Sequence, residues 1–287
     1  MRRTIPERNP VFVSINSVLA LYDRCGAPEI PSRGAERETH SVRQHQTLGP
    51  DSMNPSSGAP KAGLLSRVLP AGVTGVESWA DGHEITLFPA EEEYIAGAAP
   101  SRRREFRDVR WCARRALASL GAPPGPLVPT ATGAEFLVRY PAWPAGYTGS
   151  LTHCDGYRAA AVAAIADVLA LGIDAEPHDR LPAPALGRVA GPEELEHLAA
   201  LRAERPEVAW DRVLFSAKES VYKAWFPLTR RWFDIRDCPI SIDPYGATFT
   251  AGPALDPPEG VTPVVFGRWA VSGALAQGHV VTSAVIR

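Results

Sequence analysis

The sequence predicts an α+β fold made of two halves of similar size. The main observation is the order of segments along the chain, which runs helix, strands, helix, strands, with no short repeat. The composition, 45% hydrophobic and 22% charged, is ordinary for a globular protein and gives each half enough apolar residues for a core. We expect an N-terminal half over residues 63–166 and a C-terminal half over residues 167–287.

The first part of the N-terminal half is expected to contain a strand and a long helix. Residues 73–79 alternate loosely between apolar and polar and predict the strand. An acidic run after Pro89 predicts a helix start, because carboxylates in a first turn complement the helix dipole. Apolar residues recur at helical spacing over 102–120, and Gly121 ends that helix. A loop rich in Pro and Gly is expected from there to about Gly149.

The second half is expected to begin around a turn near Asp167, between buried strands at 159–165 and 171–175. A helix is predicted from Gly191 to about Ala203. A longer helix is predicted over 211–226, ended by Pro227. The tail predicts four strands, at 239–242, 247–250, 264–271 and 279–286.

Residues 1–62 differ from the rest of the chain. They are rich in Pro, Gly, Ser and charges and show no sustained periodicity, so we expect them to be disordered. Met53 is the only Met besides Met1. We therefore expect residues 1–52 to be a nonessential extension.

The overall charge and the cysteines exclude several classes of protein. The formal net charge of −2 gives no reason to expect nucleic-acid or membrane binding. No apolar run reaches the ~20 residues that a membrane helix needs, and no secretory signal is visible. The four cysteines, at 25, 112, 154 and 238, form no CxxC pair, which favours reduced thiols in the cytoplasm.

Lysine is rare in this chain. Of the 30 basic residues only Lys61, Lys218 and Lys223 are lysines, so 30 − 3 = 27 are arginines. Two of the three lie within six residues of each other. Lysine is a compact, mobile point charge suited to a phosphate, so this clustering marks the segment as a candidate site.

Two acids follow one another at alternate positions of a predicted strand. In the segment LGIDAEP, Asp174 and Glu176 lie on one face, ~6.6 Å apart along the backbone, while Ile173 and Ala175 face a core. Neighbouring carboxylates repel unless a cation lies between them, and oxygen ligands without Cys or His favour Mg²⁺. The alternative, two solvated acids at a strand end, is the commoner outcome for such a fragment taken alone.

The lysine-containing segment predicts a charged helix face. Glu219 and Lys223 are four residues apart and share a face, with Lys218 and Tyr222 on the adjacent stripe. A carboxylate beside a lysine at this spacing is also a common surface ion pair of little energetic value. The scarcity of lysine and the acid pair upstream argue for the functional interpretation.

Two further segments could bind phosphate. The run GSLTHCDGYR at 149–158 places small residues, hydroxyls and His153 before a buried strand, where a ligand could approach closely. His153 could equally be a capped core histidine. In the arginine-rich helix, Arg102 and Arg110 are eight residues apart and share a face, and their guanidinium groups suit phosphate oxygens. A solvated basic face is an equally good interpretation of the arginines.

Together these four segments resemble the 4′-phosphopantetheinyl transferase superfamily, in its Sfp-type and enterobactin-synthase component D-like branch and particularly its actinobacterial members. The matching pieces stand in the family's order: RRREF…VRWCARRAL at 102–117, GSLTHCDGYRAA at 149–160, LGIDAEPHD at 171–179 and FSAKESVYKAWFPLTRRW at 215–232. The resemblance covers residues 64–287. It implies a pseudodimer of two α+β subdomains with coenzyme A in the cleft between them.

The resemblance also implies a magnesium-dependent enzyme that moves phosphopantetheine from coenzyme A to a serine of an acyl or peptidyl carrier protein. It assigns roles to nine residues: Asp174, Glu176 and Glu219 as magnesium ligands; Lys218 and Lys223 on the pyrophosphate and substrate side, catalytic together with Glu219; Thr152 and His153 on the 3′-phosphate; and Arg102 and Arg110 near that phosphate. The serine proton could pass to Glu219 or to a metal-bound water. Family members often carry a lysine before the GSLTHC motif, and residues 128–139 contain none, so Arg139 replaces it or the adenine side is held less tightly.

Two other functions fit parts of the pattern. A magnesium-dependent phosphohydrolase or nucleotidyl enzyme would explain the carboxylates but not the basic residues. A degenerate, non-enzymatic module that binds coenzyme A or carrier protein is disfavoured by the intact acids and by Lys223. Because a pseudodimer supplies both halves of its own site, we expect a monomer.

Overall fold

The computed structural model describes residues 63–79, 82–130, 140–231, 233–252 and 265–287. These residues all belong to one compact unit. The predicted N-terminal extension, and Arg139 with most of the lysine-free segment, lie outside the described residues.

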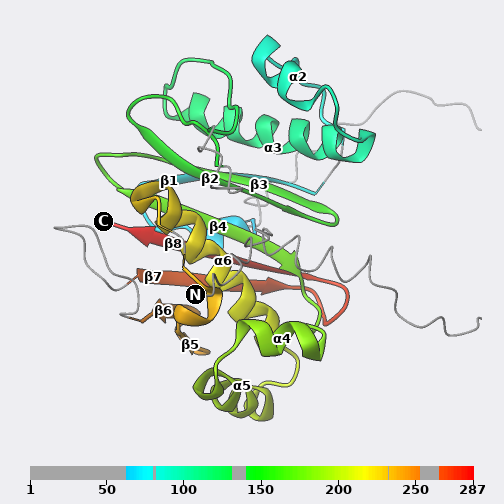
Figure 1. Cartoon of the computed structure of the whole chain (residues 1–287), viewed down its shortest axis with the longest axis vertical. Helices are drawn as coiled ribbons and strands as arrows, with labels where there is room; N and C mark the ends of the chain where they lie inside the picture. The colour runs from blue at the N-terminus through cyan, green and yellow to red at the C-terminus, as the bar shows by residue number, and fades with distance from the viewer. Residues whose placement is uncertain (1–62, 80–81, 131–139, 232, 253–264) are drawn as a thin grey trace, which may run out of the picture. The chain divides into compact units, whose positions relative to one another are not determined.

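The first half contains a three-stranded antiparallel sheet in the order β1-β3-β2 (Figure 1). Its strands are β1 (Val73–Ser78), β2 (Tyr147–Cys154) and β3 (Tyr157–Ala164). The sequence predicted a loop up to Gly149, and this prediction was wrong, because β2 pairs with β3 along its whole length. The two-residue turn Asp155-Gly156, with Gly156 at φ 69°, closes this hairpin, and such a turn was the available signal for β2.

Helices cover the outer face of this sheet. The helix α3 (Pro100–Ser119) packs Cys112, Ala113, Ala116 and Leu117 against Val162 and its neighbours, and the short α2 (Pro89–Ile95) precedes it. The apolar spacing in the sequence predicted this contact surface.

The second half contains a five-stranded antiparallel sheet in the order β4-β8-β7-β6-β5. Its strands are β4 (Ala170–Pro177), β5 (Ile240–Asp243), β6 (Thr248–Ala251), β7 (Val265–Ser272) and β8 (His279–Ile286). The long helix α6 (Trp210–Thr229) crosses one face of this sheet, and α4 (Ala183–Val189) and α5 (Pro192–Glu204) lie near the end where α6 begins (Figure 1). Two short 3₁₀ helices, η1 (Leu65–Arg67) and η2 (Ile235–Asp237), complete the described elements.

The helix α6 does not end at Pro227, as the sequence predicted, but two residues later at Thr229. Proline removes one helix hydrogen bond, which a last turn tolerates better than a helix interior. The amide of Arg230 still bonds to the carbonyl of Phe226 at 2.9 Å, and Arg230 adopts a left-handed conformation with φ 57° that ends the helix.

The core that the two sheets share includes several small residues. Ala159, Ala161 and Ala163 of β3 face a cluster that includes Ala175 of β4 and Ala270 of β7. Small side chains allow two sheets to approach closely. The sheets therefore behave as subdomains of one unit. Because β3 ends at Ala164 and β4 begins at Ala170, the structure is compatible with a boundary near residue 167, which stays a prediction.

Candidate active site

The close packing of α6 on β4 creates the charged cluster. Along β4, Gly172, Asp174 and Glu176 face α6, while Ile173 and Ala175 belong to the core between the sheets, as predicted. A Cβ atom at Gly172 would overlap the carbonyl oxygen of Ser220 on α6. Glycine at this position therefore lets the helix backbone lie directly on the strand. Glu219 and Lys223, which directly precede the contacting residues Ser220 and Ala224, are thereby placed beside the acid pair.

Asp174 is the best-held carboxylate of the cluster. Its side chain is 1% exposed, and the Lys223 Nζ lies 2.7 Å from its Oδ1. The same ammonium group donates to the carbonyl of Ile173 at 3.2 Å. Burial disfavours the charge on Lys223, but the nearby Asp174 and Glu219 outweigh it and raise the lysine pKa. The second oxygen of Asp174, Oδ2, is buried and has no hydrogen-bond partner.

Glu176 and Glu219 are buried acids whose charges are mutually unfavourable. Burial and the nearby Asp174 raise the pKa of Glu176 to about 8, although Arg212 Nη1 lies 3.0 Å from its Oε2. Burial also raises the pKa of Glu219 to about 7, with Lys223 acting against it and Asp174 adding to it. Sequence reasoning missed Arg212. Its spacing of seven residues from Glu219, two helical turns, was the signal that both face the same way.

The donor set of this cluster fits an oxygen-liganded divalent cation. Among the described residues, no group of three His, Cys, Asp or Glu side chains is close enough, as placed, to chelate a metal. The acids nevertheless converge on one region, and a buried Asp174 oxygen is unpaired there. Buried acceptors of this kind require a donor or a cation. Carboxylate oxygens without thiol or imidazole partners suit magnesium rather than zinc.

Lys218, predicted to contact pyrophosphate, lies elsewhere. Its ammonium group is fully buried and donates to the Val189 carbonyl at 2.8 Å, to Glu194 Oε2 at 2.8 Å and to the Ile235 carbonyl at 3.1 Å. All three ammonium hydrogens are thus used. The sequence placed Lys218 on the stripe next to Glu219, and that stripe faces α4, α5 and η2 rather than the acids.

Thr152 lies on the acid side of β2 and not on the same side as His153. Its hydroxyl accepts the amide of Ala175 at 2.9 Å and lies 3.5 Å from Asp174 Oδ1. Ser150, two residues earlier, accepts the amide of Ile173 at 3.0 Å. Since side chains alternate along a strand, the two hydroxyls join β2 to the otherwise unpaired edge of β4. Thr152 therefore holds β4 in this structure, and its contact with the 3′-phosphate stays a prediction.

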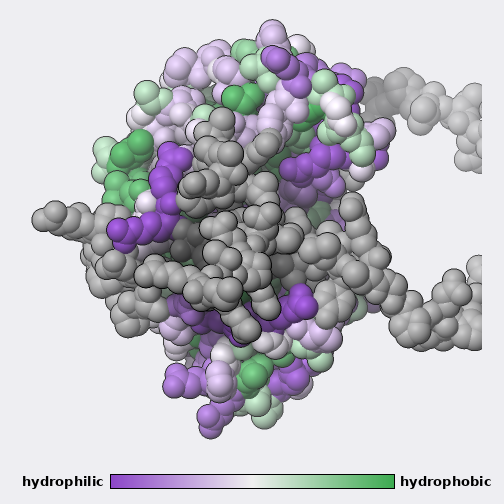
Figure 2. All heavy atoms as spheres, viewed as in Figure 1, coloured by the Kyte–Doolittle hydropathy of each residue, from purple (hydrophilic) through white to green (hydrophobic). Residues whose placement is uncertain are grey.

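His153 and Arg102 come together, as predicted, where α3 begins. Arg102 Nη1 lies 3.0 Å from His153 Nε2, and Glu105 pairs with Arg102 at 3.2 Å. Burial lowers the pKa of His153 to about 4, with Glu105 opposing and Arg102 reinforcing this shift. Figure 2 shows hydrophilic side chains gathered near the start of α3, on the right of that view. This region presents cationic and neutral hydrogen-bond donors to solvent.

Arg110 is not part of that group. It is 5% exposed, and its guanidinium group donates to the Leu127 carbonyl at 3.2 and 3.0 Å. The same group stacks 3.5 Å from the centre of the Phe106 ring. Burial lowers the pKa of Arg110 to about 9. Arg110 therefore holds the loop after α3 in this structure, and its phosphate contact stays a prediction.

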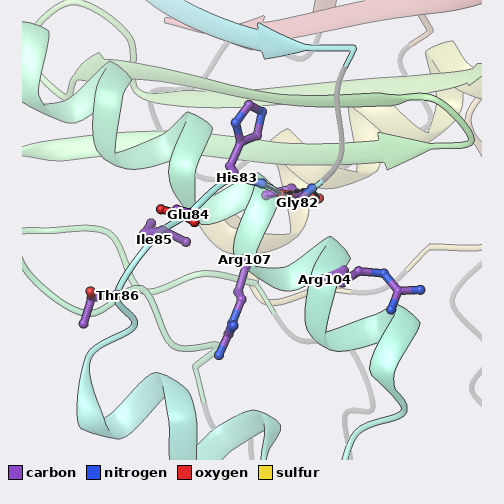
Figure 3. A pocket seen from close by; sticks show the side chains of 8 residues that line it. Gly82, His83, Glu84, Ile85, Thr86, Arg104 and Arg107 are labelled. Atoms are coloured by element: carbon purple, nitrogen blue, oxygen red, sulfur yellow. Dashed lines mark hydrogen bonds between the residues drawn. The ribbon is translucent and has the colours of Figure 1, made fainter. Parts of the chain in front are cut away.

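An open pocket of about 520 Å³ lies on another side of α3. It is lined by the segment 82–86 together with Arg104, Arg107 and Asp108. Figure 3 shows His83 pointing toward the strands and the two arginines extending from the helix in different directions. Arg107 already pairs with Glu92 at 2.9 Å. None of the nine predicted site residues lines this pocket, so it is separate from the acid cluster.

Comparison with known proteins decides the family. A sequence model described as the 4′-phosphopantetheinyl transferase N-terminal domain matches residues 90–163, and one described as the 4′-phosphopantetheinyl transferase superfamily matches residues 170–270. The chain is 44% identical to 4′-phosphopantetheinyl transferase Svp of Streptomyces mobaraensis over 236 residues, 78% of this chain and 89% of that protein. The chain belongs to the 4′-phosphopantetheinyl transferase superfamily.

Two further relatives carry the same description. The transferase is 44% identical to 4′-phosphopantetheinyl transferase Npt of Nocardia iowensis over 180 residues, 63% of this chain and 77% of the relative. It is 39% identical to 4′-phosphopantetheinyl transferase PptT of Mycobacterium tuberculosis (strain ATCC 25618 / H37Rv) over 241 residues, 78% of this chain and 98% of the relative. The resemblance to actinobacterial members is thereby confirmed, and the chain is an enzyme of this type.

The two sequence models divide the chain between the two sheets, although β1 and β8 lie outside the matched residues. The first model ends at residue 163 and the second begins at residue 170, on either side of the connection between β3 and β4. The group around His153 falls in the first match, and the acid cluster falls in the second. Among the described residues, no helix of this transferase is long and apolar enough to cross a membrane.

Proposed function

We propose that this transferase moves the 4′-phosphopantetheine group of coenzyme A onto a serine of an apo acyl or peptidyl carrier protein and releases adenosine 3′,5′-bisphosphate. The observation that carries the proposal is the buried cluster of Asp174, Glu176 and Glu219 beside Lys223. Such a cluster needs a cation, and a cation there would attract the pyrophosphate of coenzyme A. A carrier-binding module without catalysis would not require buried acids.

Magnesium is the proposed cofactor, held by Asp174, Glu176 and Glu219. When bound, it would offset the negative charge of the pyrophosphate and of the leaving nucleotide. Lys223 contributes a second positive charge from α6, held in place by Asp174. Arg212 keeps Glu176 oriented through its 3.0 Å contact. These cations and acids are positioned before the substrate arrives, which favours charge stabilisation in the transition state.

The proposed chemistry is a displacement at the β-phosphorus. The serine oxygen forms a bond to phosphorus while the bond to the oxygen of adenosine 3′,5′-bisphosphate breaks. The serine proton passes to a carboxylate. Among the described residues, Asp174 and Glu176 each have a cationic partner, whereas no such residue pairs with Glu219. We therefore assign the proton to Glu219.

We place the 3′-phosphate of coenzyme A at Arg102 and His153. Arg102 already contacts an anion there, since Glu105 lies 3.2 Å from it. A phosphate would compete with this carboxylate for the guanidinium group and would form shorter, charge-assisted hydrogen bonds. A monomer in the cytoplasm is part of the proposal. The free thiols of Cys112, Cys154 and Cys238 support the cytoplasm, and the presence of both sheets in one chain supports the monomer.

One assay separates the proposal from its rivals. The protein is incubated with an apo-carrier protein, coenzyme A and magnesium, and the intact mass of the carrier is measured by mass spectrometry. The expected result is a mass gain of one phosphopantetheine, absent when the carrier serine is replaced by alanine. Hydrolysis of coenzyme A with no mass gain would support a phosphohydrolase. Binding of coenzyme A with neither reaction would support a non-enzymatic module.

A further inference from the structure

Among the described residues of the second half, Lys218 is the most completely buried charge. A lysine without exposed atoms is costly unless its ammonium group is paired and fully hydrogen-bonded. Here the group reaches three elements at once: the last residue of α4 through Val189, the first turn of α5 through Glu194, and the start of η2 through Ile235. A single side chain of α6 thus fixes that helix against three neighbours.

Its partner Glu194 extends the network to the edge of the sheet. Oε2 of Glu194 accepts the ammonium group of Lys218 and also the amide of Gly191 at 2.9 Å, which caps α5. Oε1 accepts the amide of Ile240 at 2.9 Å, from the outer strand β5. Glu194 is 7% exposed. The pair therefore joins helix α6 to α5 and to β5 through buried charge-assisted bonds.

The location of this pair on α6 connects it to the acid cluster. Successive helix residues are ~100° apart, so Lys218 and Glu219 point in fixed and different directions. Gly172 sets the distance between α6 and β4, because no side chain separates the strand from Ser220. A close contact with a glycine limits distance but leaves rotation about the helix axis less restricted. The Lys218–Glu194 pair restrains that rotation from the adjacent side of the helix.

We propose that Lys218 and Glu194 are positioning residues that fix the rotation of α6, so that Glu219 and Lys223 face Asp174 and Glu176. This inference rests on the proposed magnesium-dependent transfer. It gives Lys218 an indirect role in place of the phosphate contact that the sequence predicted. The hydrogen bonds of the pair go to α4, α5, η2 and β5 and not to the acid cluster, so its proposed effect on metal binding passes through the position of the helix.

The test compares Lys218→Gln, Glu194→Gln and the double variant with the parent enzyme. Glu207→Gln is the matched control, because Glu207 pairs with Arg205 at the surface, 3.1 Å away. Calorimetry gives the magnesium affinity of the coenzyme A complex and the affinity for coenzyme A itself, and circular dichroism gives the folded fraction. Turnover against magnesium concentration is measured on the same samples.

Each single variant is expected to weaken magnesium binding about three- to tenfold per folded molecule, with the affinity for coenzyme A nearly unchanged. The two effects should not multiply in the double variant, because both changes loosen one contact. The control should match the parent. If Lys218→Gln does not fold, the same magnesium titration of Glu194→Gln alone tests whether the pair affects magnesium binding.

Two results would overturn the inference. The first is a tenfold loss of coenzyme A affinity caused by Lys218→Gln. If this loss were the same in the parent and in the Glu194→Gln variant, it would show a direct phosphate contact. The second is an unchanged magnesium affinity in folded Glu194→Gln, which would show that the Lys218–Glu194 pair contributes only to stability. Failure of the parent enzyme itself to respond to magnesium would instead remove the proposed function on which the inference rests.

Discussion

The helices α3 and α6 make a controlled comparison, because each has 20 residues and each covers one sheet. Both carry buried charged residues, but only those of α6 meet carboxylates on a strand of the sheet that the helix covers. In α6, Glu219 and Lys223 meet the carboxylates of β4. In α3 the sheet presents apolar residues such as Val162, and the buried Arg110 bonds to a loop carbonyl instead. The strand opposite a helix, rather than the charges on the helix, decides where a charged site forms.

The largest expected effect tests the α6 side of this comparison. Glu219→Gln keeps the shape of the side chain but removes a charge that the proposed magnesium and the serine proton both use. Loss of one preorganised charge commonly costs about 10²–10³ in rate, and we expect a fall in kcat of that size. The protein should stay folded, because the change removes one of several repelling buried acids while Lys223 keeps its contact with Asp174.

Turnover against magnesium concentration measures this effect. The variant should also need more magnesium than the parent, while Glu207→Gln at the surface should behave as the parent does. Parental turnover and a parental magnesium response in Glu219→Gln would remove Glu219 from the site and break the contrast between the helices.

The second prediction concerns the contact that creates the cluster. Gly172→Ala places a methyl group against the carbonyl of Ser220 and the amide of Ala224, both backbone atoms that cannot move independently. We expect a loss of about 1–3 kcal/mol in the free energy of unfolding and a lower kcat, because α6 must move away from β4.

Gly187→Ala is the matched control for this change. Gly187 lies in α4, and a Cβ atom there would have no neighbour within 4 Å. Alanine favours a helix by about 0.5–1 kcal/mol over glycine, so this variant should be neutral or slightly more stable. Equal stability of the two variants in urea unfolding would show that α6 does not press on β4 as the structure has it.

The third prediction separates two arginines of α3 that the sequence treated alike. Arg102→Ala should raise the KM for coenzyme A about tenfold, as expected for a lost charge-assisted hydrogen bond, and should discriminate less against 3′-dephospho-coenzyme A. Arg110→Ala should instead lower the free energy of unfolding by about 1–3 kcal/mol, because the carbonyl of Leu127 loses its buried donor. Steady-state kinetics and thermal unfolding of both variants measure the difference. If Arg102→Ala mainly lowered stability and Arg110→Ala mainly raised the KM, the roles assigned to the two arginines would have to be exchanged.

The parts of the fold that local periodicity determines were predicted well. Both long helices and the side of β4 that carries the acids follow from spacings of 3.6 and 2 residues. The missed strand β2 (Tyr147–Cys154) contains one glycine and several hydroxyl side chains, and the hydroxyls are explained only by its contact with β4. Helix α4 was also missed, since its seven residues include two helix-breaking types, Pro184 and Gly187.

The candidate site was predicted in part for the same reason. Periodicity placed Lys218 and Glu219 on neighbouring stripes of α6 but could not say which stripe would meet the acids. That choice depends on Glu194, which lies 24 residues before Lys218 in the chain. Arg110 is similar, because its partner Leu127 follows 17 residues later in a loop without a pattern. Contacts between distant segments therefore set the roles that spacing leaves open.

The smallest expected effect concerns His153, the residue of β2 that faces the start of α3. Charged groups face it from several elements: Glu105 and Arg102 of α3, Lys223 of α6 and Arg158 of β3. Burial lowers its pKa to about 4, below the value of about 6.5 expected for an unfolded chain. Because the folded pKa is the lower one, the unfolded state binds the proton first as the pH falls. The stability that neutral His153 contributes is therefore present above about pH 6.5 and is lost progressively between there and about pH 4.

We expect His153→Gln, which keeps a polar side chain without this titration, to lose less thermal stability than the parent between pH 7.5 and pH 5. The fall in the melting temperature of the parent between pH 7.5 and pH 5 should also become smaller when coenzyme A is added, because a phosphate beside His153 would favour its charged form. An equal fall in melting temperature for parent and variant would show that His153 is not held neutral, and the start of α3 would then resemble the charged cluster of α6 more closely than the structure indicates.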